Sequence, residues 1–120
     1  MHELGIMTSV LDAAESSARQ AGATRLLGVS LSIGEMTEVI EDALVFAFEA
    51  LTETNPYLKG AKLDLHIIKP KSRCLECGKE FNHERLEMFC PYCDSFALEL
   101  LEGREMSIDS IEVDLPDGDE

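Results

Sequence analysis

Two pairs of closely spaced cysteines limit most strongly what this 120-residue chain can fold into. Cys74 and Cys77 form the first Cys-x-x-Cys pair, and Cys90 and Cys93 form the second, with twelve residues between the pairs. Each pair can wrap two thiolates around one tetrahedral ion, and this spacing is typical of a zinc ribbon. Because four thiolates leave no open coordination position, we expect Zn(II) with a structural role.

The residues around the pairs also suit such a module. The position after each second cysteine often needs a left-handed backbone, which Gly78 and Asp94 adopt at little cost. His83 lies between the pairs, and because the thiolates already complete a coordination shell, we expect it on the surface. Three aromatic residues could give the small apolar cover that replaces a core: Phe81, Phe89 and Phe96.

The composition narrows the class of protein. The chain has 24 acidic and 10 basic side chains and a formal charge of -14, which repels phosphate backbones and argues against a nucleic-acid partner. It has no apolar run near the roughly 20 residues that span a bilayer, and no secretion signal at its start. We therefore expect a cytoplasmic protein with no membrane partner. Cytoplasmic thiols are kept reduced, which favours a metal site over disulfides.

Periodicity in the rest of the chain predicts two helices and three strands. Apolar residues follow helical spacing in residues 3–21 and 41–52. They alternate with other residues in 25–34, 61–69 and 106–115, as in strands with one buried face. The stripe of the first helix comprises Leu4, Met7, Leu11, Ala14 and Ala18. In the first strand the apolar face comprises Leu27, Val29, Leu31 and Ile33, and the opposite face carries only small residues: Gly28, Ser30 and Ser32.

This order predicts an α+β fold, in which a small mixed three-stranded sheet and two helices are interrupted by an inserted zinc-ribbon module. We expect the α+β domain to comprise residues 1–70 and 104–115, and the zinc ribbon to comprise residues 71–103. The acidic tail, residues 116–120, should be mobile.

The N-terminal Met1-His2-Glu3 is a candidate for nickel binding. An α-amine, backbone amides and an imidazole at position two can form fused chelate rings in one plane, and Ni(II) favours square-planar nitrogen ligation. The first amides of a helix have no acceptor within the helix, so they can lose protons without breaking a helical bond. The carboxylate of Glu3 could ligate the metal or steady the site. His66, in contrast, should be a solvated strand residue.

Four features together resemble the HypA family of hydrogenase nickel-insertion proteins. They are the opening Met-His-Glu-Leu, the segment 45–51 (Val-Phe-Ala-Phe-Glu-Ala-Leu), the paired cysteines and the closing segment 110–113 (Ser-Ile-Glu-Val). No single motif is decisive, whereas their order and spacing are. The resemblance covers nearly the whole chain except the acidic tail.

The resemblance implies a metal-delivery protein without catalytic turnover. It implies a nickel domain with His2 and Glu3, and a zinc domain with the four cysteines. Ni(II) would be the cargo, the large subunit of [NiFe]-hydrogenase the recipient and a HypB-type GTPase the partner, and some family members also supply urease. The alternative is a zinc-ribbon adaptor that binds nucleic acid or the transcription machinery, although the charge argues against it. A zinc hydrolase has little support because the predicted ligand shell is closed.

Overall fold

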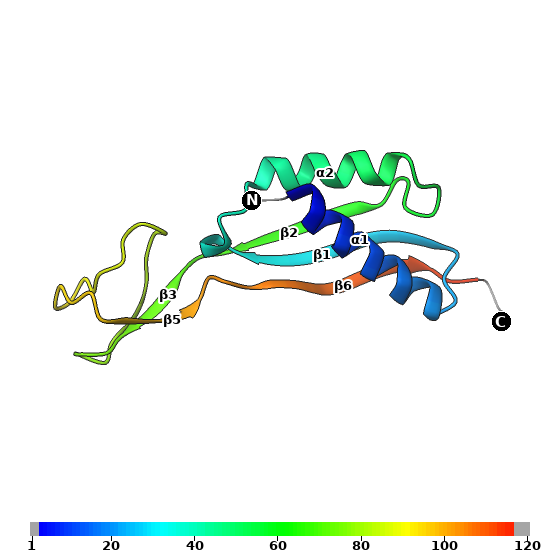
Figure 1. Ribbon diagram of the computed structural model, residues 1–120. Helices are drawn as coiled ribbons and strands as arrows, with labels where there is room; N and C mark the ends of the chain where they lie inside the picture. The colour runs from blue at the N-terminus through cyan, green and yellow to red at the C-terminus, as the bar shows by residue number, and fades with distance from the viewer. Residues whose placement is uncertain (1–2, 117–120) are drawn as a thin grey trace. The chain divides into compact units, whose positions relative to one another are not determined.

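The computed structural model describes residues 3–116, which form two compact units (Figure 1). The first unit comprises residues 3–31, 39–65 and 107–116, and the second comprises residues 32–38 and 66–106. The predicted nickel ligand His2 and residues 117–120 of the predicted tail lie outside the described residues. No helix within residues 3–116 is long and apolar enough to cross a membrane.

The predicted helices and strands are confirmed with small changes at their ends. Helix α1 spans Glu3–Gln20 and helix α2 spans Glu41–Glu53, and the two helices pack against each other. The three long strands form one sheet in the order β2-β1-β6. Their bounds are Arg25–Gly34 for β1, Lys62–Ile68 for β2 and Met106–Asp114 for β6. The fold is therefore α+β, as the sequence predicts.

The core of the first unit is formed by one face of α1, one face of α2 and the central strand β1. Its main buried residues are Met7, Leu11, Ala14, Ala18, Leu26, Val29, Leu31, Leu44, Ala47 and Phe48. The buried core departs from the periodic apolar pattern at two places. Leu4 is 58% exposed, because the first turn of α1 extends beyond the buried stripe, and Leu26 is fully buried whereas its neighbour Leu27 is only half-buried.

The small face of β1 allows both neighbouring strands to approach closely. A Cβ atom at Gly28 would lie 3.3 Å from the Lys62 carbonyl oxygen and 3.4 Å from Oε1 of Glu112. Lys62 belongs to β2 and Glu112 to β6, so Gly28 lies between the two outer strands. The close approach predicted from the small side chains is confirmed at this position.

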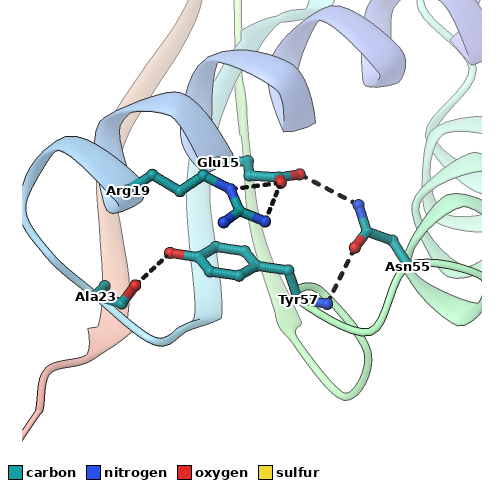
Figure 2. A network of polar contacts seen from close by, with 5 residues as sticks. All are labelled: Glu15, Arg19, Ala23, Asn55 and Tyr57. Atoms are coloured by element: carbon teal, nitrogen blue, oxygen red, sulfur yellow. Dashed lines mark hydrogen bonds and ion pairs between the residues drawn. The ribbon is translucent and has the colours of Figure 1, made fainter.

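A polar network fixes the loop between α2 and β2 to α1 (Figure 2). The carboxylate of Glu15 accepts hydrogen bonds from Nε of Arg19 at 2.9 Å and from Nδ2 of Asn55 at 3.2 Å. The Tyr57 hydroxyl donates to the Ala23 carbonyl at 2.8 Å, and the Arg19 guanidinium lies 4.0 Å from the centre of the Tyr57 ring. The loop is thus bound to both the helix and the turn that follows it.

The second unit contains three short strands that were not predicted from the sequence. Strand β3 (Lys71–Cys74) lies between β4 (Glu80–Asn82) and β5 (Leu98–Glu102), and both pairings are antiparallel. These strands are three to five residues long and rich in charged residues, so they have little apolar alternation. Their register places Ser72 opposite Phe81, which becomes important at the cysteine cluster.

Residues 32–38 join the second unit through glycine contacts. The Gly34 N–H donates to the Glu105 carbonyl and the Met36 N–H to the Gly103 carbonyl, both at 2.7 Å. A Cβ atom on Gly34 would lie 2.1 Å from the Gly103 backbone, so no other residue fits there without a shift. The short 3-10 helix η1 (Glu35–Thr37) follows this contact.

Two leucine substitutions on α1 test the assignment of its buried face. Leu11 is 3% exposed, so Leu11→Ala should lower the free energy of unfolding by about 2–5 kcal/mol through lost burial and a cavity. The exposed Leu4 provides the matched control, and Leu4→Ala should change the stability by less than about 0.5 kcal/mol. Denaturant titrations followed by circular dichroism measure both effects. Equal losses of stability would contradict the assignment.

Candidate metal centre

The four cysteines predicted as zinc ligands come together in the second unit. Their sulfur atoms all lie within 4.8 Å of one another. Across the two pairs, Sγ of Cys74 lies 3.5 Å from Sγ of Cys93, and Sγ of Cys77 lies 3.6 Å from Sγ of Cys90. Four convergent sulfur donors are a set that fits tetrahedral Zn(II). No other group of three or more possible metal-ligating side chains is found within residues 3–116.

Both cysteine pairs adopt the same turn. The Gly78 N–H donates to the Cys74 carbonyl at 2.9 Å, and the Asp94 N–H donates to the Cys90 carbonyl at 2.8 Å. Gly78 has a φ of 79° and Asp94 a φ of 62°, so the predicted left-handed backbone is confirmed at both positions. Each turn therefore directs two cysteines toward the same point.

Backbone N–H groups also point at the sulfur atoms. Sγ of Cys74 accepts hydrogen bonds from the N–H groups of Glu76 and Cys77, each at 3.4 Å. The bond from the Cys77 N–H is the largest cause that lowers the pKa of Cys74 to about 6. At Cys93 a bond from the Ser95 N–H lowers the pKa, but the neighbouring sulfur of Cys74 and burial raise it to about 12. The backbone N–H groups thus favour the thiolate form of Cys74, which is the form in which a cysteine binds a metal.

The apolar cover of the cluster is smaller than predicted. Phe81 is buried and packs with Cys74 and Cys90, and Leu98 lies against the same group. Phe96, however, is 82% exposed, and Phe89 is also exposed, with its ring 6.5 Å from that of Phe96. The prediction of a three-residue cover is therefore wrong for Phe89 and Phe96. Phe81 differs because it lies on β4, opposite Ser72, whereas the other two lie outside the strands.

His83 is buried, which corrects the prediction of a surface position. Its Nδ1 lies 2.8 Å from the Glu84 carbonyl oxygen, and its Nε2 lies 2.8 Å from Oγ of Ser72, which is fully buried. Because a carbonyl oxygen can only accept, Nδ1 must carry a hydrogen, and Nε2 is then free to accept from the serine hydroxyl. The His83 side chain thus links the residue that follows β4 to Ser72 of β3. The sequence could not reveal this, since it depends on the pairing of two short strands.

Three basic residues close to the cysteines are paired with acidic residues of the same unit. Lys69 lies within 3.7 Å of both Glu35 and Glu84. The other ion pairs are Lys71 with Glu80 and Arg73 with Glu99. Because acidic partners neutralise these side chains, they do not form a positively charged surface for nucleic acid. This weakens the alternative of a nucleic-acid adaptor.

Glu3 of the predicted nickel site is the first residue of α1, and its side chain reaches α2. Oε2 of Glu3 accepts a hydrogen bond from the Ile40 N–H at 2.9 Å, and Ile40 is the N-cap residue of α2. The carboxylate therefore lies at the positive end of the α2 dipole. The role of Ile40 has no signal in the sequence, because its contribution is a backbone amide. His66 lies on β2 and is exposed.

Comparisons with known proteins agree over nearly the full length of the chain. The family model described as "Hydrogenase/urease nickel incorporation, metallochaperone, hypA" matches residues 1–113. Hydrogenase maturation factor HypA of Geobacter metallireducens is 36% identical, over 95% of this chain and 100% of that protein. The protein of the same name from Methanocaldococcus jannaschii is 34% identical, over 98% of this chain and 100% of its own length.

A solved structure has a similar fold. The solution structure of the Ni metallochaperone HypA from Helicobacter pylori superimposes with a TM-score of 0.67 and 28% identity. The match covers 97% of this chain and 100% of that chain. The similarity therefore includes both units.

Substitution of a buried cysteine tests the metal site. Cys90→Ser should lose zinc and destabilise the second unit, because a hydroxyl is a poor replacement for a thiolate and this unit has few buried apolar residues. Leu75→Ala, at a 62% exposed position between the cysteines of the first pair, should keep its full zinc content. Elemental analysis and thermal unfolding measure the two effects. A Cys90→Ser variant with normal zinc content would contradict the assignment.

Proposed function

Because the chain belongs to the HypA family of hydrogenase/urease nickel-incorporation metallochaperones, we propose that it captures Ni(II) at its N-terminus through His2 and Glu3. The observation that carries this proposal is the family match, which begins at residue 1 and runs to residue 113. The matched region thus includes both the N-terminal triplet and the four cysteines.

The start of α1 supports nickel binding by backbone nitrogens. Helix α1 begins at Glu3, so the amide of this residue has no acceptor within the helix. With the imidazole of His2 and the amides of His2 and Glu3, three nitrogen donors can lie in one plane with the metal, as square-planar Ni(II) prefers. The charge of deprotonated amides would offset the repulsion between Ni(II) and the positive end of the helix dipole.

We propose that the Glu3 side chain positions the site and does not ligate the metal. Its carboxylate is already bound by the Ile40 N–H at 2.9 Å. This contact attaches the first residue of α1 to the start of α2, and so it restricts the backbone whose amide would bind nickel. Positioning groups of this kind commonly determine the affinity of a metal site.

The cysteine cluster is proposed to hold a structural Zn(II). Four thiolates would leave no position for a substrate or for Ni(II), and binding of the metal would supply folding free energy to a unit with little apolar core. We propose residues 1–70 and 104–115 as the nickel-binding domain and residues 71–103 as the zinc-ribbon domain. Of the first set, residues 32–38, 66–70 and 104–106 belong to the second compact unit.

Delivery is proposed to occur by ligand exchange with the recipient. A nickel site with few ligands at a chain terminus can be reached by the ligands of the recipient protein. Acid should release nickel, because the imidazole of His2 must be neutral to bind the metal. The recipient would be the large subunit of [NiFe]-hydrogenase, with a HypB-type GTPase as partner in the cytoplasm, and the family description extends the recipients to urease. The protein acts here as a carrier and catalyses no reaction.

Substitution of His2 tests the nickel site. His2→Ala should abolish tight nickel binding while zinc content and fold remain, because the imidazole is the strongest side-chain donor of the triplet. The exposed His66 provides the matched control, and His66→Ala should bind nickel as the wild type does. Calorimetric titration with Ni(II), together with elemental analysis for zinc, measures both. Wild-type affinity in His2→Ala would rule out the site.

Two substitutions at Glu3 separate positioning from ligation. Glu3→Gln keeps an oxygen that can accept from the Ile40 N–H, so nickel affinity should stay within about twofold of wild type. Glu3→Ala removes this acceptor and should weaken binding several-fold, in line with the roughly 1 kcal/mol of an exposed hydrogen bond. If the carboxylate were a ligand, both variants would lose affinity to a similar extent.

A further inference from the structure

The four sulfur atoms of the cluster differ in their access to solvent. Cys74 and Cys90 are fully buried, whereas Cys77 and Cys93 are exposed. Each exposed cysteine has a buried one as its neighbour in the opposite pair, since the Sγ atoms of Cys93 and Cys74 lie 3.5 Å apart and those of Cys77 and Cys90 lie 3.6 Å apart. A reagent in solution therefore meets one sulfur of each cross-pair first.

Hydrogen bonding sets Cys74 apart from the other three cysteines. Cys74 is held by two backbone N–H groups at 3.4 Å, and buried Cys90 accepts from the Tyr92 N–H at 3.4 Å. Exposed Cys77 and Cys93 are each approached by one backbone N–H, from Lys79 and Ser95 respectively. A hydrogen bond stabilises charge on sulfur and lowers its nucleophilicity, so the doubly bonded and buried Cys74 should react last.

We propose that Cys77 and Cys93 form a reactive edge of the cluster, at which hydroperoxides oxidise the protein and close two disulfides, Cys74–Cys93 and Cys77–Cys90. The pairing follows from the short distances between sulfurs of opposite pairs. This reaction is separate from nickel binding and concerns only the second unit.

The chemistry requires one molecule of hydrogen peroxide for each disulfide. The Cys93 thiolate attacks a peroxide oxygen, the O–O bond breaks, and the products are a Cys93 sulfenic acid and hydroxide. The Cys74 thiolate then attacks the Cys93 sulfur, forms the S–S bond and expels a second hydroxide. The thiolate pair loses two electrons, the peroxide gains them, and Zn(II) keeps its oxidation state. Loss of two thiolates removes half of the ligand set, so zinc dissociates.

Within each Cys-x-x-Cys pair, the first sulfur already accepts a hydrogen bond from a backbone N–H of the turn. The Cys77 N–H donates to Sγ of Cys74, and this bond and the left-handed turn at Gly78 hold the first pair around the metal position. A bond between Cys74 and Cys77 would compete with this hydrogen bond. The two cross-pair disulfides need only a further approach of atoms that are already neighbours.

Alkylation of the zinc-loaded full-length protein tests the exposed edge. After a short exposure to limiting N-ethylmaleimide, Cys77 and Cys93 should be labelled at least about tenfold faster than Cys74 and Cys90. Cleavage after Glu76 by a glutamyl endopeptidase and after Tyr92 by chymotrypsin separates the two cysteines of each pair for mass spectrometry. Equal labelling of all four cysteines would show that the site opens as a whole, and it would overturn the proposal.

Oxidation by hydrogen peroxide tests the pairing. Zinc release, followed with a colorimetric chelator, should accompany the appearance of Cys74–Cys93 and Cys77–Cys90 in non-reducing peptide maps. A Cys74–Cys77 or Cys90–Cys93 disulfide as the first product would overturn the proposed connectivity. Retention of zinc and of all four thiols at a peroxide concentration that oxidises free glutathione would overturn the reactive edge itself.

Discussion

The second unit depends on the convergence of four sulfur atoms within 4.8 Å of one another. Thiolates at this distance repel one another, and a cation bound between them, as proposed for Zn(II), would offset this repulsion. Around the cluster the buried apolar cover is limited to Phe81 and the partly buried Leu98. The short strands β3, β4 and β5 therefore gain much of their order from the same centre that holds the cysteines.

The sequence predicted the features that depend on residues close together in the chain, and it missed those that depend on distant segments. Local signals were sufficient for α1, α2, the long strands and the left-handed turns at Gly78 and Asp94. They failed where pairing between distant segments decides the outcome. His83 is buried because β3 and β4 place it beside Ser72, and residues 32–38 join the second unit because Gly34 contacts Gly103.

The candidate site shows the same division. The spacing of the cysteines identified the whole cluster, because each pair forms a turn of its own. The aromatic cover was overestimated, since Phe89 and Phe96 contact each other and remain exposed. Glu3 was identified as a candidate site residue, but its contact with α2 was not predicted. The partner is the backbone amide of Ile40, 37 residues away, and a backbone amide gives no signal in the sequence.

We propose that backbone amides at the start of α1 hold nickel, whereas the cysteine cluster does not bind it. A proton–nitrogen NMR spectrum of the zinc-loaded protein, recorded before and after one equivalent of Ni(II), tests it most directly. We predict narrow signals, because square-planar Ni(II) is diamagnetic, with loss of the Glu3 amide signal, a shift at Ile40 and unchanged signals around the four cysteines. Retention of the Glu3 signal, with broadening or shifts at the cysteines, would contradict the account.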